Sequence, residues 1–228
     1  MIGNSHAACF KIAWNTLKAS YPSVTLTFFA DRKTGISELE PKGGLLVPTS
    51  ERLQRVLAHT SVGHTAIDPR DYDIILMVGL SPGYPDAPGF YSYAAASRAL
   101  LDETPASIAF ELIRKIRQTS AIPIFLAHKP LLRHEGETQP DGDAGPYRRL
   151  IKLLNDELVR DAGATLLEQP EQTITHCFFS RPEYAIGSSR LDVGSKWLPL
   201  EQPGDQRAHM NELYGEIYLS THLPTIMS

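Results

Sequence analysis

The stretch from Tyr72 to Gly79 reads Y-D-I-I-L-M-V-G and is nearly continuous in apolar residues. Strands of this composition are buried on both faces, which is typical of a parallel sheet covered by helices on each side. Parallel neighbours also need long connections, and these are usually helices. The stretch therefore predicts an α/β fold in which it forms a central strand.

The rest of the chain supplies elements that alternate around this strand. A short first strand is expected before Gly3, because little chain precedes it, and helical patterns of apolar residues separate the strands. Apolar runs bounded by turn residues predict further strands at Val24 to Phe29, Ile122 to Ala127 and Ala164 to Leu167. We predict one domain over residues 1–228. Its fold is expected to be three-layer α/β/α, with a flavodoxin-like, doubly wound sheet of about five mainly parallel strands.

Composition excludes several classes of function. The formal net charge of −4 and the pI near 6.1 give no basic surface for nucleic acid or an anionic membrane. The longest apolar run, Ile74 to Leu80, is too short to span a bilayer, and no secretory leader is evident, so we expect a cytoplasmic protein. The absence of a glycine-rich phosphate loop argues against a nucleotide binder. Composition leaves the oligomeric state open.

No metal or other cofactor is expected. Cys9 and Cys177 lie in apolar stretches without the spacing of a zinc site or a disulfide framework. His59 and His64 do not have the i, i+4 spacing that places two side chains on one helix face. His128 follows a predicted strand, so it is expected either to line the site or to have a structural role.

Two stretches near the ends of the chain carry residues for nucleophilic catalysis. The first is Gly3 to His6 (G-N-S-H), and the second is Asp205 to Asn211 (D-Q-R-A-H-M-N). A serine becomes a competent nucleophile when an imidazole accepts its proton and a carboxylate orients that imidazole. Ser5, His209 and Asp205 are the candidates for these roles. The helical pattern after Ser5 places it at the carboxyl end of the first strand, where active sites of open α/β sheets lie.

These stretches resemble the sequence blocks of the SGNH, or GDSL-like, hydrolases. That family has a Gly-Asp-Ser block near its amino terminus and an Asp-x-x-His block near its carboxyl terminus. Here Asn4 stands in place of the first aspartate, and Asp205 lies one residue further from His209 than the family's pattern has it. The third block, Gly-x-Asn-Asp, corresponds to Gly79 to Pro82 (G-L-S-P) and lacks the asparagine.

The resemblance implies a serine hydrolase that cleaves an acyl ester, such as an acetyl ester of a sugar or another small alcohol. Gly43 and Gly44 are the candidates for the oxyanion glycine of the second block. They lie in the turn-rich stretch Arg32 to Pro48, which we predict to be a loop. Gly79 and Ser81 are candidates for oxyanion or substrate binding.

Two points stay open at the level of sequence. The chain is either a hydrolase or a relative of the same fold that binds a carbohydrate or acyl ligand, or transfers an acyl group, without competent hydrolysis. The stretch Leu80 to Gly89, rich in proline and glycine, is either a rim that faces the substrate or an ordinary surface loop.

Overall fold

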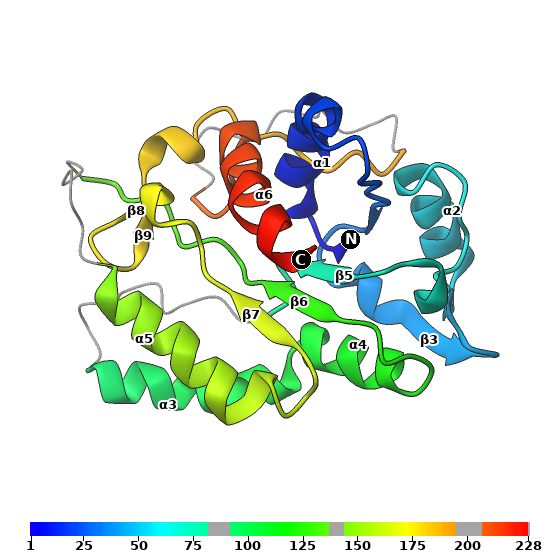
Figure 1. Cartoon of the computed structure of the whole chain (residues 1–228), viewed down its shortest axis with the longest axis horizontal. Helices are drawn as coiled ribbons and strands as arrows, with labels where there is room; N and C mark the ends of the chain where they lie inside the picture. Colours follow the sequence, from blue (N-terminus) through cyan, green and yellow to red (C-terminus); the bar gives the residue numbers. More distant parts are fainter. Residues whose placement is uncertain (82–91, 137–143, 195–206, 228) are drawn as a thin grey trace.

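A computed structural model describes residues 1–81, 92–136, 144–194 and 207–227 of the chain (Figure 1). Its central sheet has five parallel strands in the order β2-β1-β5-β6-β7. The strands are β1 (Ile2–Gly3), β2 (Phe29–Ala30), β5 (Ile75–Val78), β6 (Ile124–Ala127) and β7 (Thr165–Leu167). One strand lies outside β1 and the later strands follow on its other side, which is the flavodoxin-like order. The predicted fold class is therefore confirmed.

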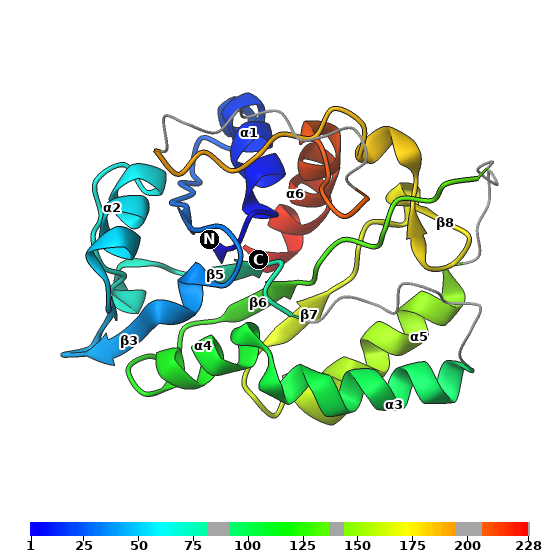
Figure 2. The same ribbon diagram turned by 180° about the vertical axis from the view of Figure 1, so that it is seen from behind.

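Helices cover both faces of the sheet (Figure 1, Figure 2). The helices are α1 (Ala7–Leu17), α2 (Glu51–Thr60), α3 (Tyr93–Glu103), α4 (Ile108–Arg117), α5 (Gly145–Leu154) and α6 (Glu212–Ile226). Shorter helical turns are η1 (Lys18–Ser20), η2 (Gly35–Glu38), η3 (Pro69–Asp71), η4 (Thr104–Ala106), the π-helical η5 (Asn155–Val159), η6 (Glu171–Thr173) and η7 (Pro182–Tyr184). Within the described ranges, no helix has the length and apolar character needed to cross a membrane.

Strand β5 is buried on both faces, as its apolar sequence predicts. Ile75 and Met77 belong to the hydrophobic core that α2, α3, α4 and α5 cover. Leu76 and Val78 belong to the core on the opposite face, which α1 and α6 cover. Because side chains alternate along a strand, this one strand anchors both helical layers.

Strand β2 is shorter than the predicted run Val24 to Phe29. Only Phe29 and Ala30 pair in the sheet, and their partners are Ile2 and Gly3 of β1. Since β2 is an edge strand whose only neighbour is β1, the ladder cannot extend beyond the few residues that β1 offers. The short first strand is confirmed, and the same shortness explains why the predicted second strand is too long.

The stretch Arg32 to Pro48 contains an antiparallel hairpin, so the prediction of a loop is wrong. β3 (Leu39–Lys42) pairs with β4 (Leu45–Pro48). Gly43 and Gly44 connect them with φ angles of 61° and 87°. Two consecutive residues of positive φ suit a two-residue hairpin turn, and glycine adopts them without steric strain. A second hairpin consists of β8 (Ile174–Thr175) and β9 (Phe179–Ser180).

The first and last helices pack tightly against each other. The ring of Phe10 in α1 contacts the ring of Tyr218 in α6 edge to face, with centroids 5.2 Å apart. Gly215 of α6 lies so close to α1 that an added Cβ would be 2.4 Å from the carbonyl oxygen of Cys9. This glycine therefore sets the spacing of the two helices, and their pairing brings the two ends of the chain together.

Candidate active site

Ser5 lies in the turn between β1 and α1, at the carboxyl end of the sheet. Asn4 fixes this turn from two sides. Its side-chain amide donates to the carbonyl oxygen of Gly79 at 2.6 Å, and its Oδ1 accepts from the backbone N–H of His6 at 3.0 Å. Asn4 is buried, so both bonds lie in a medium of low dielectric constant, where they are strong. The asparagine thus holds the serine turn against the exit of β5.

Gly79 is required by this packing. Its φ of 70° lies in the left-handed region that favours glycine. An added Cβ would lie 2.5 Å from Asn4 Oδ1 and 2.7 Å from His6 Cδ2. Gly79 therefore lies against the turn that holds Ser5. Its backbone N–H donates to the carbonyl oxygen of Ala127 at 2.9 Å, so it is not available to an oxyanion.

His209 precedes α6 and is positioned by Asn211, the residue that caps this helix. Asn211 Oδ1 accepts from the backbone N–H of Tyr214 at 3.3 Å. Its Nδ2 donates to the carbonyl oxygens of Glu183 and Ile186, at 2.7 Å and 2.9 Å. One side chain thus starts the helix and ties the histidine segment to the neighbouring turn η7.

Ser5 and His209 meet although they are 204 residues apart in the sequence. The distance from Ser5 Oγ to His209 Nε2 is 3.0 Å, so the hydroxyl can donate to the ring nitrogen. Burial lowers the pKa of His209, and the nearby positive charge of Arg190 lowers it further. At neutral pH the imidazole is therefore uncharged and able to accept the serine proton.

No protein-family model, curated protein or solved structure matches this chain.

The atoms around Ser5 determine which reactions the site can support. In the described part of the chain, nothing accepts a hydrogen bond from the Ser5 backbone N–H. This N–H lies just before α1, where unpaired helix N–H groups favour negative charge. This N–H is therefore left to donate to a negatively charged group that binds beside Ser5.

His6 completes the cluster and is not among the residues predicted from the sequence. Its ring stacks on that of His209, with centroids 4.8 Å apart and planes inclined by 16°. Burial, then the proximity of His209 and Lys129, lowers the pKa of His6 to about 3. A neutral ring can support the flat face of His209 without repelling a protonated form of that ring. The only signal in the sequence is that His6 directly follows Ser5.

Asp205, the predicted orienting acid, lies outside the described residues. His209 Nδ1 is buried and has no hydrogen-bond partner among residues 1–81, 92–136, 144–194 and 207–227. A buried polar atom without a partner costs free energy, so this nitrogen is the place for an orienting acceptor. Asp205 in this role stays a prediction. Most of the stretch Leu80 to Gly89 also lies outside the described residues.

Gly43 and Gly44 are not brought to Ser5. An added Cβ on Gly44 would lie 3.5 Å from the guanidinium of Arg70. Arg70 belongs to η3, which leads to the amino end of β5, whereas Ser5 follows the carboxyl end of β1. Figure 1 shows the tip of the β3 hairpin pointing away from α1. The hairpin turn explains both glycines. The predicted oxyanion role of Gly43 and Gly44 is therefore not supported by the topology.

Ser5 is not among the residues that surround Ser81 and His128. They line a separate cavity of about 10 Å³ among the side chains that α3, α5 and β6 contribute. His128 Nε2 lies 2.7 Å from the hydroxyl of Tyr147. Both residues are buried. His128 therefore has the structural role, which was one of its two predicted roles.

Neither a metal cluster nor a reactive thiol adds to the site. No group of three or more histidine, cysteine, aspartate or glutamate side chains that could bind a metal occurs in the part of the chain that the structure describes. Cys9 is buried, its thiol donates to the His6 carbonyl oxygen at 3.2 Å, and burial raises its pKa to about 12. The thiolate needed for nucleophilic attack is therefore not formed at neutral pH.

Proposed function

We propose that this chain is a serine hydrolase of SGNH type that cleaves an acyl ester, including an O-acetyl ester, of a carbohydrate or another small alcohol. The observation that carries the proposal is the 3.0 Å separation of Ser5 Oγ and His209 Nε2. A general base must come within this reach of the proton that it removes. The resemblance of the two terminal stretches to the SGNH blocks supports the same reading.

In the first half of the reaction, Ser5 Oγ attacks the ester carbonyl carbon while its proton passes to His209 Nε2. The negative charge develops on the carbonyl oxygen, and the Ser5 backbone N–H donates to it. The tetrahedral intermediate then collapses. The bond to the alcohol oxygen breaks, and the proton on His209 passes to that oxygen, which leaves an acyl group on Ser5.

In the second half, water replaces the alcohol. His209 Nε2 takes a proton from the water as its oxygen attacks the acyl carbon. The bond to Ser5 Oγ then breaks, and the proton returns to this oxygen. The products are a carboxylic acid and the free enzyme. His6 keeps the ring of His209 in place during both halves because it stacks on the face of the imidazole.

A second candidate is a protein of the same fold that binds an ester or saccharide without hydrolysing it, or that transfers the acyl group to another alcohol. The observation in its favour is the small number of hydrogen-bond donors identified for an oxyanion. Gly43 and Gly44 lie in the β3–β4 hairpin, and the Gly79 N–H donates to Ala127, which leaves the Ser5 N–H as the candidate donor. Losing one such donor costs on the order of 100-fold or more in rate.

Turnover of 4-nitrophenyl acetate and labelling by a fluorophosphonate test the proposal together. We expect the label on Ser5 in a peptide digest. Ser5→Ala should abolish labelling and turnover while the unfolding midpoint stays unchanged, because the hydroxyl contributes little packing. Ser20→Ala, an exposed serine at the end of η1, is the matched control. Turnover that persists in Ser5→Ala contradicts the proposal.

The same assay separates the alternatives. An acetyl group that accumulates on Ser5 in water but leaves when an alcohol such as glycerol is added identifies an acyltransferase. Saccharide binding without labelling of Ser5 identifies a binding protein. A protein whose Ser5 reacts with the fluorophosphonate and which releases acetate at a constant rate in water is the hydrolase.

A further inference from the structure

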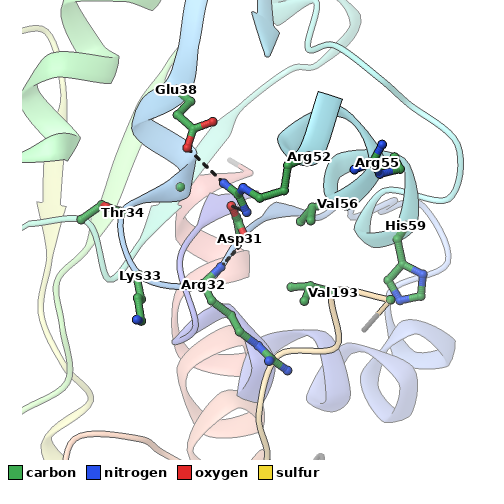
Figure 3. A pocket seen from close by; sticks show the side chains of 12 residues that line it. Asp31, Arg32, Lys33, Thr34, Glu38, Arg52, Arg55, Val56, His59 and Val193 are labelled. Carbon is green, nitrogen blue, oxygen red and sulfur yellow. Dashed lines mark hydrogen bonds and ion pairs between the residues drawn. The ribbon is translucent and has the colours of Figure 1, made fainter. Parts of the chain in front are cut away.

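A cavity of about 710 Å³ lies beyond the carboxyl end of β2. It is bordered by the turn that follows β2, by one face of α2 and by Val193 and Gly194 (Figure 3). Its size falls within the range of ligand pockets in proteins, roughly 300–1,000 Å³. None of the residues predicted from the sequence lines it, so the candidate active site leaves this cavity without a role.

The cavity and the active site share a border. Gly3 of β1 pairs with Ala30 of β2, so the turn after β2 and the turn that holds Ser5 leave the sheet side by side. The segment Arg190–Gly194 runs along both. The charge of Arg190 acts on His209, whereas Gly194 lines the cavity.

Arg32 joins this segment to the cavity. Its Nε and Nη2 donate to the carbonyl oxygen of Leu191, at 3.0 Å and 2.7 Å. His59 on α2 contacts Asp192, with Nε2 3.1 Å from the carboxylate. The segment that borders His209 is thus held in place by residues of the cavity, and a ligand that fills the cavity lies next to the active site.

The cavity is positively charged although the chain as a whole has a net charge of −4. Its lining includes the basic residues Arg32, Lys33, Arg52 and Arg55 and the acidic residues Asp31 and Glu38. Arg52 contacts both carboxylates, at 2.8 Å from Asp31 and 3.1 Å from Glu38. The two acids are thereby neutralised in part, and the cavity keeps an excess of positive charge.

Lys33 and Arg55 remain for a ligand, whereas two nitrogens of Arg32 already donate to the carbonyl oxygen of Leu191. Among the residues that the structure describes, no carboxylate lies within ion-pair distance of Arg32 or Lys33. Arg55 contacts Glu51 at 3.6 Å, and both side chains are mostly exposed, so this pair is weak. Figure 3 shows Arg55 and His59 on the same helix, with Val193 across the cavity. Arginine and lysine recognise carboxylates and phosphates through charge-assisted hydrogen bonds.

We propose that this cavity binds the carboxylate of an acidic sugar, so that the ester is carried by an acidic saccharide. The identity of the ester rests on the proposed function, but the binding of the sugar does not. A singly charged carboxylate fits better than a phosphate dianion, because Asp31 and Glu38 remain in the lining and repel a second negative charge. The apolar side chains of Val56 and Val193 offer a surface for the sugar ring.

Calorimetric titration of Ser5→Ala protein tests this proposal without interference from hydrolysis. The probes are methyl glucuronide and methyl glucoside, which differ only at carbon 6, where one has a carboxylate and the other a hydroxymethyl group. We expect the glucuronide to bind about tenfold more tightly or better at low salt. Raising the salt concentration should reduce this preference, because screening weakens the attraction.

Variants assign the preference to the cavity. Lys33→Gln combined with Arg55→Gln should bring the two affinities to within about twofold of each other. Arg98→Gln is the matched control, since Arg98 of α3 pairs with Asp102 four residues away just as Arg55 pairs with Glu51, but lies outside the cavity. Unfolding midpoints show whether each variant is folded. If the double variant unfolds, amide chemical shifts of Lys33 to Gly35 during titration of the parent protein decide instead.

Three results overturn the proposal: equal affinity for the two sugars, tighter binding of inorganic phosphate than of the glucuronide, or a preference that the double variant keeps. These results are distinct from a failure of the hydrolase proposal. That proposal is tested by 4-nitrophenyl acetate, an uncharged probe that needs no acidic sugar. Glucuronide binding without ester turnover would retain the cavity assignment and replace the hydrolase by a binding protein.

Discussion

Ser5 with His209, and Ser81 with His128, lie at the carboxyl end of the sheet, and the two histidines differ in what they can do. Ser5 and His209 lie 3.0 Å apart, and both side chains are only partly buried. Ser81 and His128 line one small cavity, and both are buried. The comparison shows that a serine and a histidine in one cavity need not be hydrogen-bonded to each other.

The ring nitrogens explain the difference. His128 Nδ1 lies 2.5 Å from the carbonyl oxygen of Lys129, and Nε2 lies 2.7 Å from the hydroxyl of Tyr147. With Nδ1–H donating to the carbonyl, Nε2 accepts from Tyr147 and has no lone pair left for a serine. His209 directs Nε2 at Ser5 instead. A histidine can act as a base only if one ring nitrogen keeps a lone pair for the proton. In His209 this lone pair points at Ser5 and the ring is partly exposed, whereas His128 is buried.

Replacing each histidine should give opposite results, and this is the largest effect that we expect. His209→Gln should reduce kcat by about 10⁴ to 10⁶, by analogy with the loss of the triad histidine in a serine protease, with little change in stability. His128→Gln should retain kcat but lower the free energy of unfolding by about 1–3 kcal/mol, because buried partners lose their hydrogen bonds. Turnover of 4-nitrophenyl acetate and denaturant unfolding measure the two. Comparable losses of kcat in both variants would remove the distinction.

The two histidines also differ in the group that accepts a hydrogen bond from ring nitrogen Nδ1. The Lys129 carbonyl fixes the ring of His128, and we predict that Asp205 does the same for His209. Asp205→Asn should then reduce kcat by about 10⁴, because the wrong tautomer is favoured. Asp161→Asn, an exposed aspartate after η5, should leave kcat unchanged. If Asp205→Asn changes kcat by less than about threefold, the site is a Ser-His dyad.

Gly215 tests whether helix spacing sets the Ser5 to His209 distance. An added Cβ would lie 2.4 Å from the backbone oxygen of Cys9, so Gly215→Ala must push α6 away from α1. A displacement of about 1 Å at a reacting pair can cost on the order of 100-fold in rate, and we expect a loss of 10- to 100-fold in kcat here. Ser220→Ala, on the exposed face of α6, is the control. Helix propensity alone would make Gly215→Ala stabilising, so an active and more stable variant would contradict this account.

The pH dependence of the rate gives the smallest effect. His209 must be neutral to act as a base, and burial and Arg190 both lower its pKa. The ratio kcat/KM should therefore fall only when the pH drops below the ordinary histidine value of about 6.5. Removing the positive charge in Arg190→Gln makes the imidazolium less unfavourable, so the midpoint should move to higher pH. Arg98→Gln should leave it in place, and an unchanged midpoint in Arg190→Gln would show that burial alone lowers the pKa.

The fold could be predicted to the extent that it depends on burial along single strands. β5 was predictable because a strand covered on both faces is apolar throughout. The length of β2 was not, since it depends on how many residues β1 presents. The Gly43–Gly44 turn carries a hairpin signal, but its position follows only from its closeness to Arg70 of η3, which leads to the amino end of β5.

The candidate site also has residues that the sequence predicts and residues that only the structure reveals. Ser5 and His209 could be proposed because each lies in a short stretch with the residue types that acyl transfer needs. His6 could not, because its stacking on His209 arises only when α6 docks on α1. The cationic cavity combines three separate segments, and no one of them shows it. Contacts between distant segments are thus the part of the site that requires the structure.

The docking of α6 against α1 also decides when during biosynthesis Ser5 meets His209. A ribosome releases the chain from its amino terminus, so the turn with Ser5 emerges early, 204 residues before its base. Until α6 has left the exit tunnel and packed beside Gly215, the imidazole of His209 is not in reach of the hydroxyl. Under the proposed function, we therefore expect the nascent polypeptide to be inactive toward esters until α6 has packed against α1.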